Sequence, residues 1–410
     1  MNTPKIHIDL RMVLFVVIAT NIASRAIASK HVGSSNRVHY LSESKHVQKQ
    51  VKFWEKVFSS IPSTSVLIHD SDFPDLITDL IDFKVFAKSL GKKVLTSRSY
   101  RHKIAEGYLA RYELALKRFR ADGRGAAKLG SIERRIFNVY KTNPIALKKL
   151  FKGQISLRSQ AGLADEFGRA VERAYKVLPY MERVFQRKGL PIDLTRIVFV
   201  ESMFNPKALS KVGASGIWQF MPATARQFMT VNRLIDERNS PYKASEGAAK
   251  LLARNYRSLK SWPLAVTAYN FGRAGIEKAT RKTRTDDLGY IIKNYRAKSF
   301  GFASKNFYAE FIAARNVHQK YFSKDRRKYY NNDVTKIKLS KPISISKLVS
   351  NTAIDKNMLS QYNLCLTKKA LKHYQHKPLP AGFNIFVPSS HAGSVKFAVS
   401  RSQFSRNERF

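Results

Sequence analysis

The chain has 410 residues, of which 44% are hydrophobic, so it is long enough for two or three globular domains with their own cores. Its 74 Lys and Arg residues outnumber its 29 Asp and Glu residues, and the formal net charge of +45 indicates a polyanionic partner: nucleic acid, an acidic membrane surface or a cell-wall polymer. Because Cys365 is the single cysteine, an intramolecular disulfide is excluded.

The first residues have the layout of a secretory signal peptide. Lys5 and Arg11 precede a short apolar run at 12–19, and Ala-Ile-Ala at 26–28 fits a cleavage site. The alternatives are a buried N-terminal helix or an uncleaved anchor, but the run is too short for a permanent membrane anchor. We therefore predict a signal peptide at 1–28 and export to the periplasm or the medium, which disfavours nucleic acid as the partner.

Residues 29–158 are predicted to form a basic helical N-terminal region. Apolar residues recur at helical spacing in 47–58, and 73–83 is interpreted in the same way. Taken one at a time, the many basic residues of 98–150 fit a solvated helix face, and together they favour an anionic polymer as partner.

The segment 159–189 has the pattern of an amphipathic helix broken at Pro179, with Gly189 as its C-cap. Pro191 suits the first turn of the next helix, which is expected to end near Glu201. Later helices are predicted from Pro222 and at 245–259, 263–269 and 304–322. No segment of 159–325 alternates like a strand, so this domain is predicted to be all-α.

Glu201 is the unusual residue of this domain. It follows Leu194, Ile197 and Val198 at i+7, i+4 and i+3, so it shares their apolar helix face. A carboxylate on such a face is costly to ionise, which raises its pKa and makes it a candidate proton donor. The alternative is a helix-end Glu whose side chain reaches solvent.

The C-terminal part has a different pattern, because period-two alternation marks two strands around two short helices. We predict a small β-α-α-β module at 330–390 and a basic tail without regular structure at 391–410. The strands are expected at 334–339 and 383–387, and the helices at 344–350 and 355–361.

Two stretches carry a family resemblance. Residues 201–224 read ESMFNPKALSKVGASGIWQFMPAT, and residues 268–272 read AYNFG. Both resemble the catalytic core of the SLT-type lytic transglycosylases of glycoside hydrolase family 23, and most of all the membrane-bound lytic murein transglycosylase D group. The resemblance extends over 159–322.

That resemblance implies a lysozyme-like α-helical domain acting on peptidoglycan glycan strands. Glu201 would protonate the β-1,4 oxygen between N-acetylmuramic acid and N-acetylglucosamine, and then act as base on the muramic 6-hydroxyl to give a 1,6-anhydro end. The substrate's acetamido group replaces a second carboxylate. No cofactor or metal is implied, and we expect a monomer.

The resemblance also assigns roles to other residues. Some have alternatives: loop capping for Ser210, a helix-start hydrogen bond for Gln219, and core packing for Met221 and Tyr269. The implied sugar contacts are Ser210, Gln219, Met221, Tyr269 and Asn270, with Ser202, Gly213 and Gly216 in support.

Departures from the family pattern open another interpretation. Phe271 stands where a small residue is usual, and 303–307 lacks the family's Glu and Tyr. These changes raise the hypothesis of a modified, for example N-deacetylated, glycan. Such a sugar lacks the acetamido nucleophile, so a lysozyme-like hydrolase with a second carboxylate, Asp236 or Glu237, is the alternative.

The C-terminal module resembles a degenerate LysM domain, a glycan-binding module, although its usual Asn-Pro is Asn363-Leu364 here. The alternative is a small structural domain that supports the catalytic one. For the whole chain, an inactive wall-binding scaffold is the further alternative to an enzyme.

Overall fold

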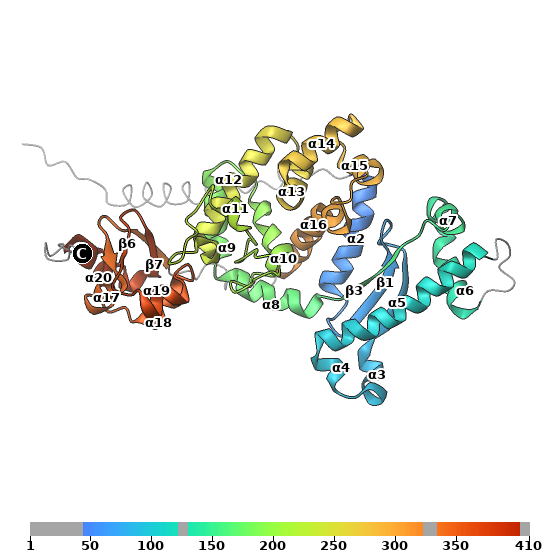
Figure 1. Cartoon of the computed structure of the whole chain (residues 1–410), viewed down its shortest axis with the longest axis horizontal. Helices are drawn as coiled ribbons and strands as arrows, with labels where there is room; N and C mark the ends of the chain where they lie inside the picture. Colours follow the sequence, from blue (N-terminus) through green and yellow to red (C-terminus); the bar gives the residue numbers. More distant parts are fainter. Residues whose placement is uncertain (1–43, 122–129, 323–333, 402–410) are drawn as a thin grey trace, which may run out of the picture. The chain divides into compact units, whose positions relative to one another are not determined.

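The computed structural model describes residues 44–121, 130–322 and 334–401 (Figure 1). The predicted signal peptide lies outside these ranges. Helices predominate, and the prediction of a mainly α protein is confirmed. In the described ranges, no helix combines the length and the apolar character that crossing a membrane requires.

The N-terminal region contains a three-stranded antiparallel sheet in the order β2-β1-β3. Every residue of the central strand β1 is buried. The helix predicted at 73–83 is wrong, because its second half pairs with β1; the β-branched Ile77, Thr78 and Ile81 favour a strand over a helix there. The strands are β1 (Ser65–Asp70), β2 (Ile77–Asp82) and β3 (Leu157–Ala161).

The described residues of this region also form six helices. Several of them pack on the sheet around one hydrophobic core that includes Val66 and Ile68 of β1, Tyr112 and Tyr140. At the centre of that core, the Tyr140 hydroxyl donates a 2.6 Å hydrogen bond to buried Asp70. The helices are α2 (Lys45–Ser59), α3 (Phe83–Leu90), α4 (Lys93–Thr96), α5 (Arg98–Ala121), α6 (Ser131–Tyr140) and α7 (Pro144–Phe151).

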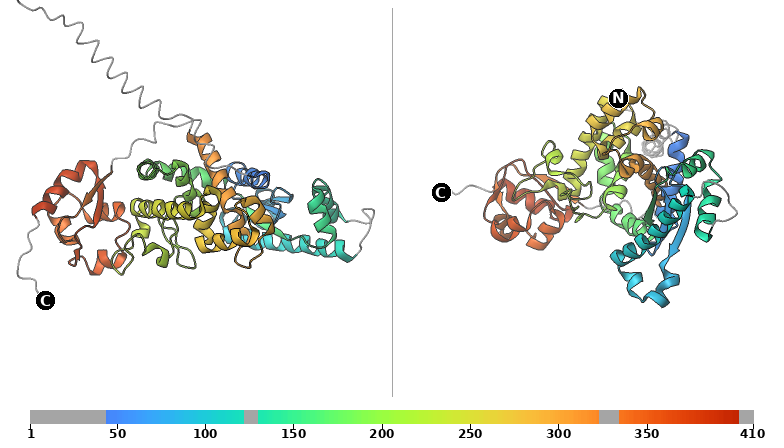
Figure 2. Two further views of the ribbon diagram at one scale, coloured as in Figure 1. Left: turned by 90° about the horizontal axis from the view of Figure 1, so that it is seen from above. Right: turned by 45° about the vertical axis from the view of Figure 1, so that its right-hand side comes forward.

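Helix α2 joins this region to the helical domain, because it lies along the much later helix α16 (Phe302–Phe322), as Figures 1 and 2 show. The indole nitrogen of Trp54 donates a 3.1 Å hydrogen bond to Asn306 Oδ1 across this contact. The pair is buried, so the hydrogen bond satisfies two polar groups that would otherwise be desolvated without partners.

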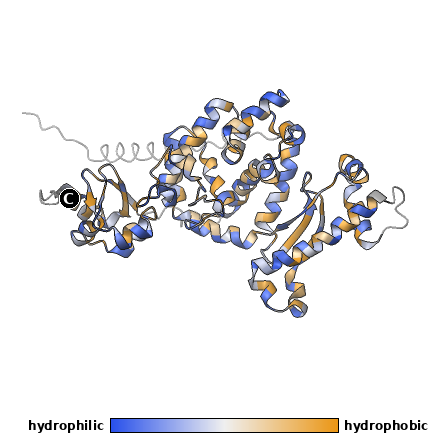
Figure 3. Ribbon diagram, viewed as in Figure 1, coloured by the Kyte–Doolittle hydropathy of each residue, from blue (hydrophilic) through white to orange (hydrophobic). Residues whose placement is uncertain are grey.

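The helical domain begins with α8 (Ala164–Tyr175) and α9 (Leu178–Arg187), and Pro179 lies in the first turn of α9, so the predicted break is confirmed. Both helices carry hydrophobic and hydrophilic residues (Figure 3), as amphipathic helices do. The elements that follow are η3 (Ile192–Arg196), α10 (Ile197–Ser202), α11 (Pro222–Ala225), η4 (Glu237–Asn239), α12 (Pro241–Leu259), α13 (Trp262–Phe271), α14 (Arg273–Thr283), α15 (Leu288–Asn294) and α16.

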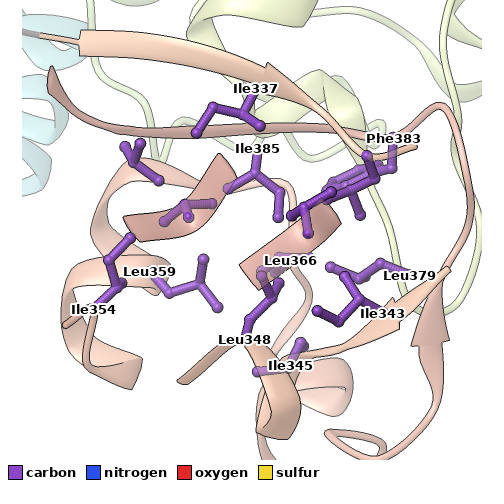
Figure 4. Packing of buried hydrophobic residues seen from close by; sticks show 14 of the residues in the cluster. Ile337, Ile343, Ile345, Leu348, Ile354, Leu359, Leu366, Leu379, Phe383 and Ile385 are labelled. Atoms are coloured by element: carbon purple, nitrogen blue, oxygen red, sulfur yellow. The ribbon is translucent and has the colours of Figure 1, made fainter. Parts of the chain in front are cut away.

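The C-terminal module has two small antiparallel pairs, β4 with β7 and β5 with β6. Its core is formed by apolar side chains such as Ile337, Leu359 and Ile385 (Figure 4). Fully buried Asn363 donates to Phe386 O and accepts from Phe386 N, which ties α18 to β7. The elements are β4 (Val334–Lys338), β5 (Ile343–Ser344), α17 (Ile345–Ser350), α18 (Lys356–Tyr362), α19 (Lys368–His373), β6 (Pro378–Leu379), β7 (Asn384–Pro388) and η6 (Ser389–His391).

The expectation of an irregular tail from 391 is wrong for its first half. Residues Ala392–Arg401 form helix α20, and Val395 and Val399 belong to the core of the module. The apolar spacing of four residues is a helical signal that the surrounding Ser, Arg and Lys residues obscured.

The module is also bonded to the helical domain. Ile235 forms a β-bridge with Leu366, and Thr367 N donates to Leu234 O at 3.0 Å. Nearby, the rings of Tyr242 and Phe386 stack with centroids 4.3 Å apart. These contacts connect the module to α12 and to the segment that precedes it.

The position of α20 predicts a stability effect. Val395 is 1% exposed, so Val395→Ala should lower the free energy of unfolding by roughly 1–3 kcal/mol, measured by urea denaturation. Lys396→Ala, at an exposed position of the same helix, is the matched control and should change stability little. Equal effects of the two variants would contradict the packing of α20.

Candidate active site

Glu201 lies in the last turn of α10, two residues after the buried run Ile197, Val198 and Phe199. The chain then turns sharply, because Met203 and Phe204 both have left-handed backbones, with φ of 50° and 55°. Left-handed conformations cost non-glycine residues free energy, and such strain is concentrated at functional sites.

Arg173 of α8 stabilises this turn. Its Nε and Nη2 atoms donate hydrogen bonds of 3.0 and 2.8 Å to Met203 O. The Ser202 hydroxyl donates a 2.7 Å hydrogen bond to Ile217 O, which fixes the end of α10 against the following loop. The end of the helix, and therefore the backbone of Glu201, is held from two sides.

The Glu201 side chain keeps some solvent exposure but is surrounded by protein. Desolvation by burial raises its pKa to about 8, and the carboxylate of Glu310 adds to the shift. Within the described ranges, no cation pairs with Glu201 and no hydrogen bond engages its carboxylate. The group is therefore protonated at neutral pH, as the sequence predicted.

Glu310, on α16, is a second carboxylate that the sequence interpretation missed. Burial raises its pKa to about 8 as well. It stands in an apolar run with Phe307 and Phe311, so the pattern that singled out Glu201 could also have found it.

Tyr269, near the end of α13, lies within electrostatic range of Glu201, and Asn270 follows it in the chain. The Tyr269 hydroxyl donates a 2.8 Å hydrogen bond to Trp218 O, and its ring stacks on Phe307 at 6.3 Å and 5°. Burial and the nearby Glu201 raise the pKa of Tyr269 well above its usual value. Asn270 is exposed, and its Oδ1 accepts a 2.7 Å hydrogen bond from Ser304.

The loop after α10 carries the remaining predicted residues. Ser210 Oγ accepts a 2.9 Å hydrogen bond from Ala214 N, so loop capping is at least part of its role. Gln219 Nε2 donates to Ala208 O and Gly216 O at 3.2 and 2.8 Å, which leaves its side-chain oxygen for other partners.

Two positions in this loop require glycine. Met221, a predicted sugar contact, is accessible to solvent. Gly213 and Gly216 have φ of 88° and 76°, and a Cβ on Gly216 would overlap Arg238 O. Met221 is 41% exposed, which favours a surface role over core packing.

The predicted second carboxylates, Asp236 and Glu237, both have partners in the protein. Asp236 forms an ion pair and hydrogen bonds of 2.7 and 2.9 Å with Arg238, and Glu237 is buried and accepts from Thr230 N at 2.8 Å. Arg238 in turn donates to Gly213 O and Phe220 O at 2.7 and 3.1 Å. This network supports the loop and adds no acid to the site.

The unusual Phe271 packs edge-on against Phe300, with centroids 4.9 Å apart. Among the described residues, no group of three or more His, Cys, Asp or Glu side chains could hold a metal ion.

Comparison with known proteins agrees with this geometry. Residues 185–291 match the transglycosylase SLT domain family. The chain is 24% identical over 205 residues to membrane-bound lytic murein transglycosylase D of Escherichia coli (strain K12), a match that covers 45% of this chain and 42% of that protein.

Two further relatives are called membrane-bound lytic murein transglycosylase F. The protein of Ectopseudomonas mendocina (strain ymp) is 25% identical over 206 residues, covering 45% of this chain and 39% of the relative. That of Shewanella halifaxensis (strain HAW-EB4) is 30% identical over 122 residues, covering 27% and 24%. The chain thus spans less than half the length of each of these three relatives.

The matched segment contains Glu201, the loop that follows it, and Tyr269 with Asn270, whereas Glu310 lies beyond its end. The chain contains a transglycosylase SLT domain and is related through it to the lytic murein transglycosylases.

Proposed function

We propose that this protein cleaves the glycan strands of peptidoglycan, at the β-1,4 bond between N-acetylmuramic acid and N-acetylglucosamine. The observation that carries the proposal is Glu201, a desolvated, protonated carboxyl group at the end of α10 inside an SLT domain. A general acid works best when its pKa lies near the operating pH, and this group meets that requirement.

In the proposed reaction, Glu201 gives its proton to the glycosidic oxygen while the bond to C1 breaks. The resulting carboxylate then accepts a proton from the muramic 6-hydroxyl, whose oxygen bonds to C1, and a 1,6-anhydro end is released. Burial disfavours the carboxylate, so it recovers a proton readily and is ready for the next cycle. Tyr269 and Asn270 would orient the sugars.

A muramidase is the second candidate, favoured by Glu310 beside Glu201. Water would then replace the 6-hydroxyl, and the product would carry a reducing end. Such chemistry does not require the acetamido group, so an N-deacetylated glycan belongs to this candidate. Mass spectrometry of the products separates the two candidates, since anhydro ends are lighter by one water.

Export, binding to an anionic wall and glycan binding by the C-terminal module complete the proposal. The net charge of +45 supports attraction to an acidic polymer. A monomer without cofactor or permanent anchor suffices for this activity. If the SLT domain were only a wall-binding scaffold, sacculi would be bound and left intact.

The first prediction concerns Glu201→Gln. Without the proton donor, release of soluble fragments from purified sacculi should fall by a factor of about 10²–10⁴, because general acid catalysis is lost. Glu172→Gln makes the same substitution at an exposed position of α8 and should retain activity. Equal turnover in both variants would support the inactive scaffold instead.

The second prediction concerns pH. Glu201 is active when protonated, and its folded pKa is about 8, so kcat/KM should decline as pH rises through about 8. The rate of fragment release between pH 5 and 10 tests this, with protein stability followed in parallel. A decline centred near pH 4–5, where an ordinary carboxyl group titrates, would contradict the assignment.

The third prediction concerns the support of the loop. Arg238→Lys removes the fork that binds Asp236 and the carbonyls of Gly213 and Phe220, so turnover should fall roughly tenfold and the free energy of unfolding by about 1–3 kcal/mol. Activity assays and urea denaturation measure both effects. Arg226→Lys, at an exposed position after α11, is the control and should change neither.

A further inference from the structure

The two carboxylates of the site come from elements that pack against each other, α10 with Glu201 and α16 with Glu310. Phe307 lies one helical turn before Glu310, and its ring stacks on Tyr269, which is itself within electrostatic range of Glu201. The four side chains therefore form one cluster that joins α10, α13 and α16.

Among the described residues, this cluster contains two carboxyl groups and no basic side chain. On α8, Arg173 donates two hydrogen bonds to the backbone oxygen of Met203. On α16, the pKa of His318 is lowered by burial and then by Arg196, so its ring is neutral. On α2, Glu55 accepts a 2.7 Å hydrogen bond from Asn316.

Neither carboxylate of the cluster takes part in an ion pair or hydrogen bond within the described ranges. Like charges that are close and poorly solvated oppose each other's ionisation, as in other carboxyl pairs. The pair therefore titrates as a unit. Among the described residues, the Glu310 carboxylate thus has no partner that would explain it as a structural group. The carboxylates of Asp236 and Glu237, by contrast, are bound by Arg238 and by Thr230 N.

We propose, on the basis of the function proposed above, that Glu310 is a positioning residue that acts through Glu201 and forms a coupled acid pair with it. When Glu310 is ionised, its negative charge opposes ionisation of Glu201, so Glu201 keeps its proton to higher pH. After Glu201 has protonated the leaving oxygen, the same repulsion makes its carboxylate a stronger base.

The proton balance of the cycle is closed. Glu201 loses one proton to the glycosidic oxygen as the electron pair of the C1–O bond moves to that oxygen. It regains one from the attacking hydroxyl as the new C1–O bond forms. Glu310 donates nothing to the substrate, so it tunes both halves of the reaction through charge alone.

The test compares Glu310→Gln, Glu310→Asp and the control Glu172→Gln in the full chain, acting on purified sacculi. Removing the charge of Glu310 lowers the pKa of Glu201, so the alkaline limb of the pH profile of kcat/KM should move down by about one pH unit. We expect kcat to fall roughly tenfold, Glu310→Asp to restore part of both effects, and Glu172→Gln to behave as the original protein.

Several outcomes would overturn the inference. One is a Glu310→Gln profile that coincides with the control; another is a loss of kcat without any shift of the limb, which would show a merely structural role. If the thermal transition shows that Glu310→Gln does not fold, Glu310→Asp replaces it in the test. An alkaline limb of its kcat/KM profile that coincides with the control would then contradict the inference. An original protein that releases no fragments would refute the proposed function itself, which is a separate result.

Discussion

The desolvation of one carboxyl group is the constraint on which this site depends. Glu201 follows three fully buried residues of α10, and its position at the carbonyl end of a helix adds partial negative charge nearby. Neither feature could be retained if the helix continued or if its end moved into solvent. The left-handed Met203 and Phe204, and the two hydrogen bonds from Arg173, end the helix at the point where the carboxyl group stays partly accessible.

The same arrangement sets stability against function. Because the pKa values of Glu201 and Glu310 are raised to about 8, the folded protein binds more protons than the unfolded chain between about pH 4.5 and 8. The contribution of these groups to stability is therefore fully present below pH 4.5 and is lost as pH rises through 8. A core that replaced both acids with apolar residues would be more stable at neutral pH, and it would lack a proton donor.

The sequence was informative where local rules and the family motif agreed. Glu201, the break before Pro179 and the glycine positions in the loop follow from periodicity and backbone chemistry. The strand β2 could not be predicted in this way, because a short apolar run fits both the helical and the strand period. Only its pairing with β1 shows that it is a strand. From the sequence, Asp236 looked available as an acid. Nothing in the sequence shows that the Arg238 guanidinium, two residues later, binds the Asp236 carboxylate. The apolar pattern could have singled out Glu310, but its place near Glu201 required knowing that α16 packs on α10, an element more than 90 positions earlier in the chain.

The support of the loop also bears on the role of the C-terminal module. Asp236 N donates a 2.8 Å hydrogen bond to Cys365 O, while its carboxylate orients Arg238. Arg238 holds the carbonyls of Gly213 and Phe220, on either side of Gln219. A continuous set of hydrogen bonds thus leads from the module to the loop beside Glu201. Whether or not the module binds glycan, it is part of the structure that positions the proposed sugar contacts, and the structural alternative therefore has its own physical basis.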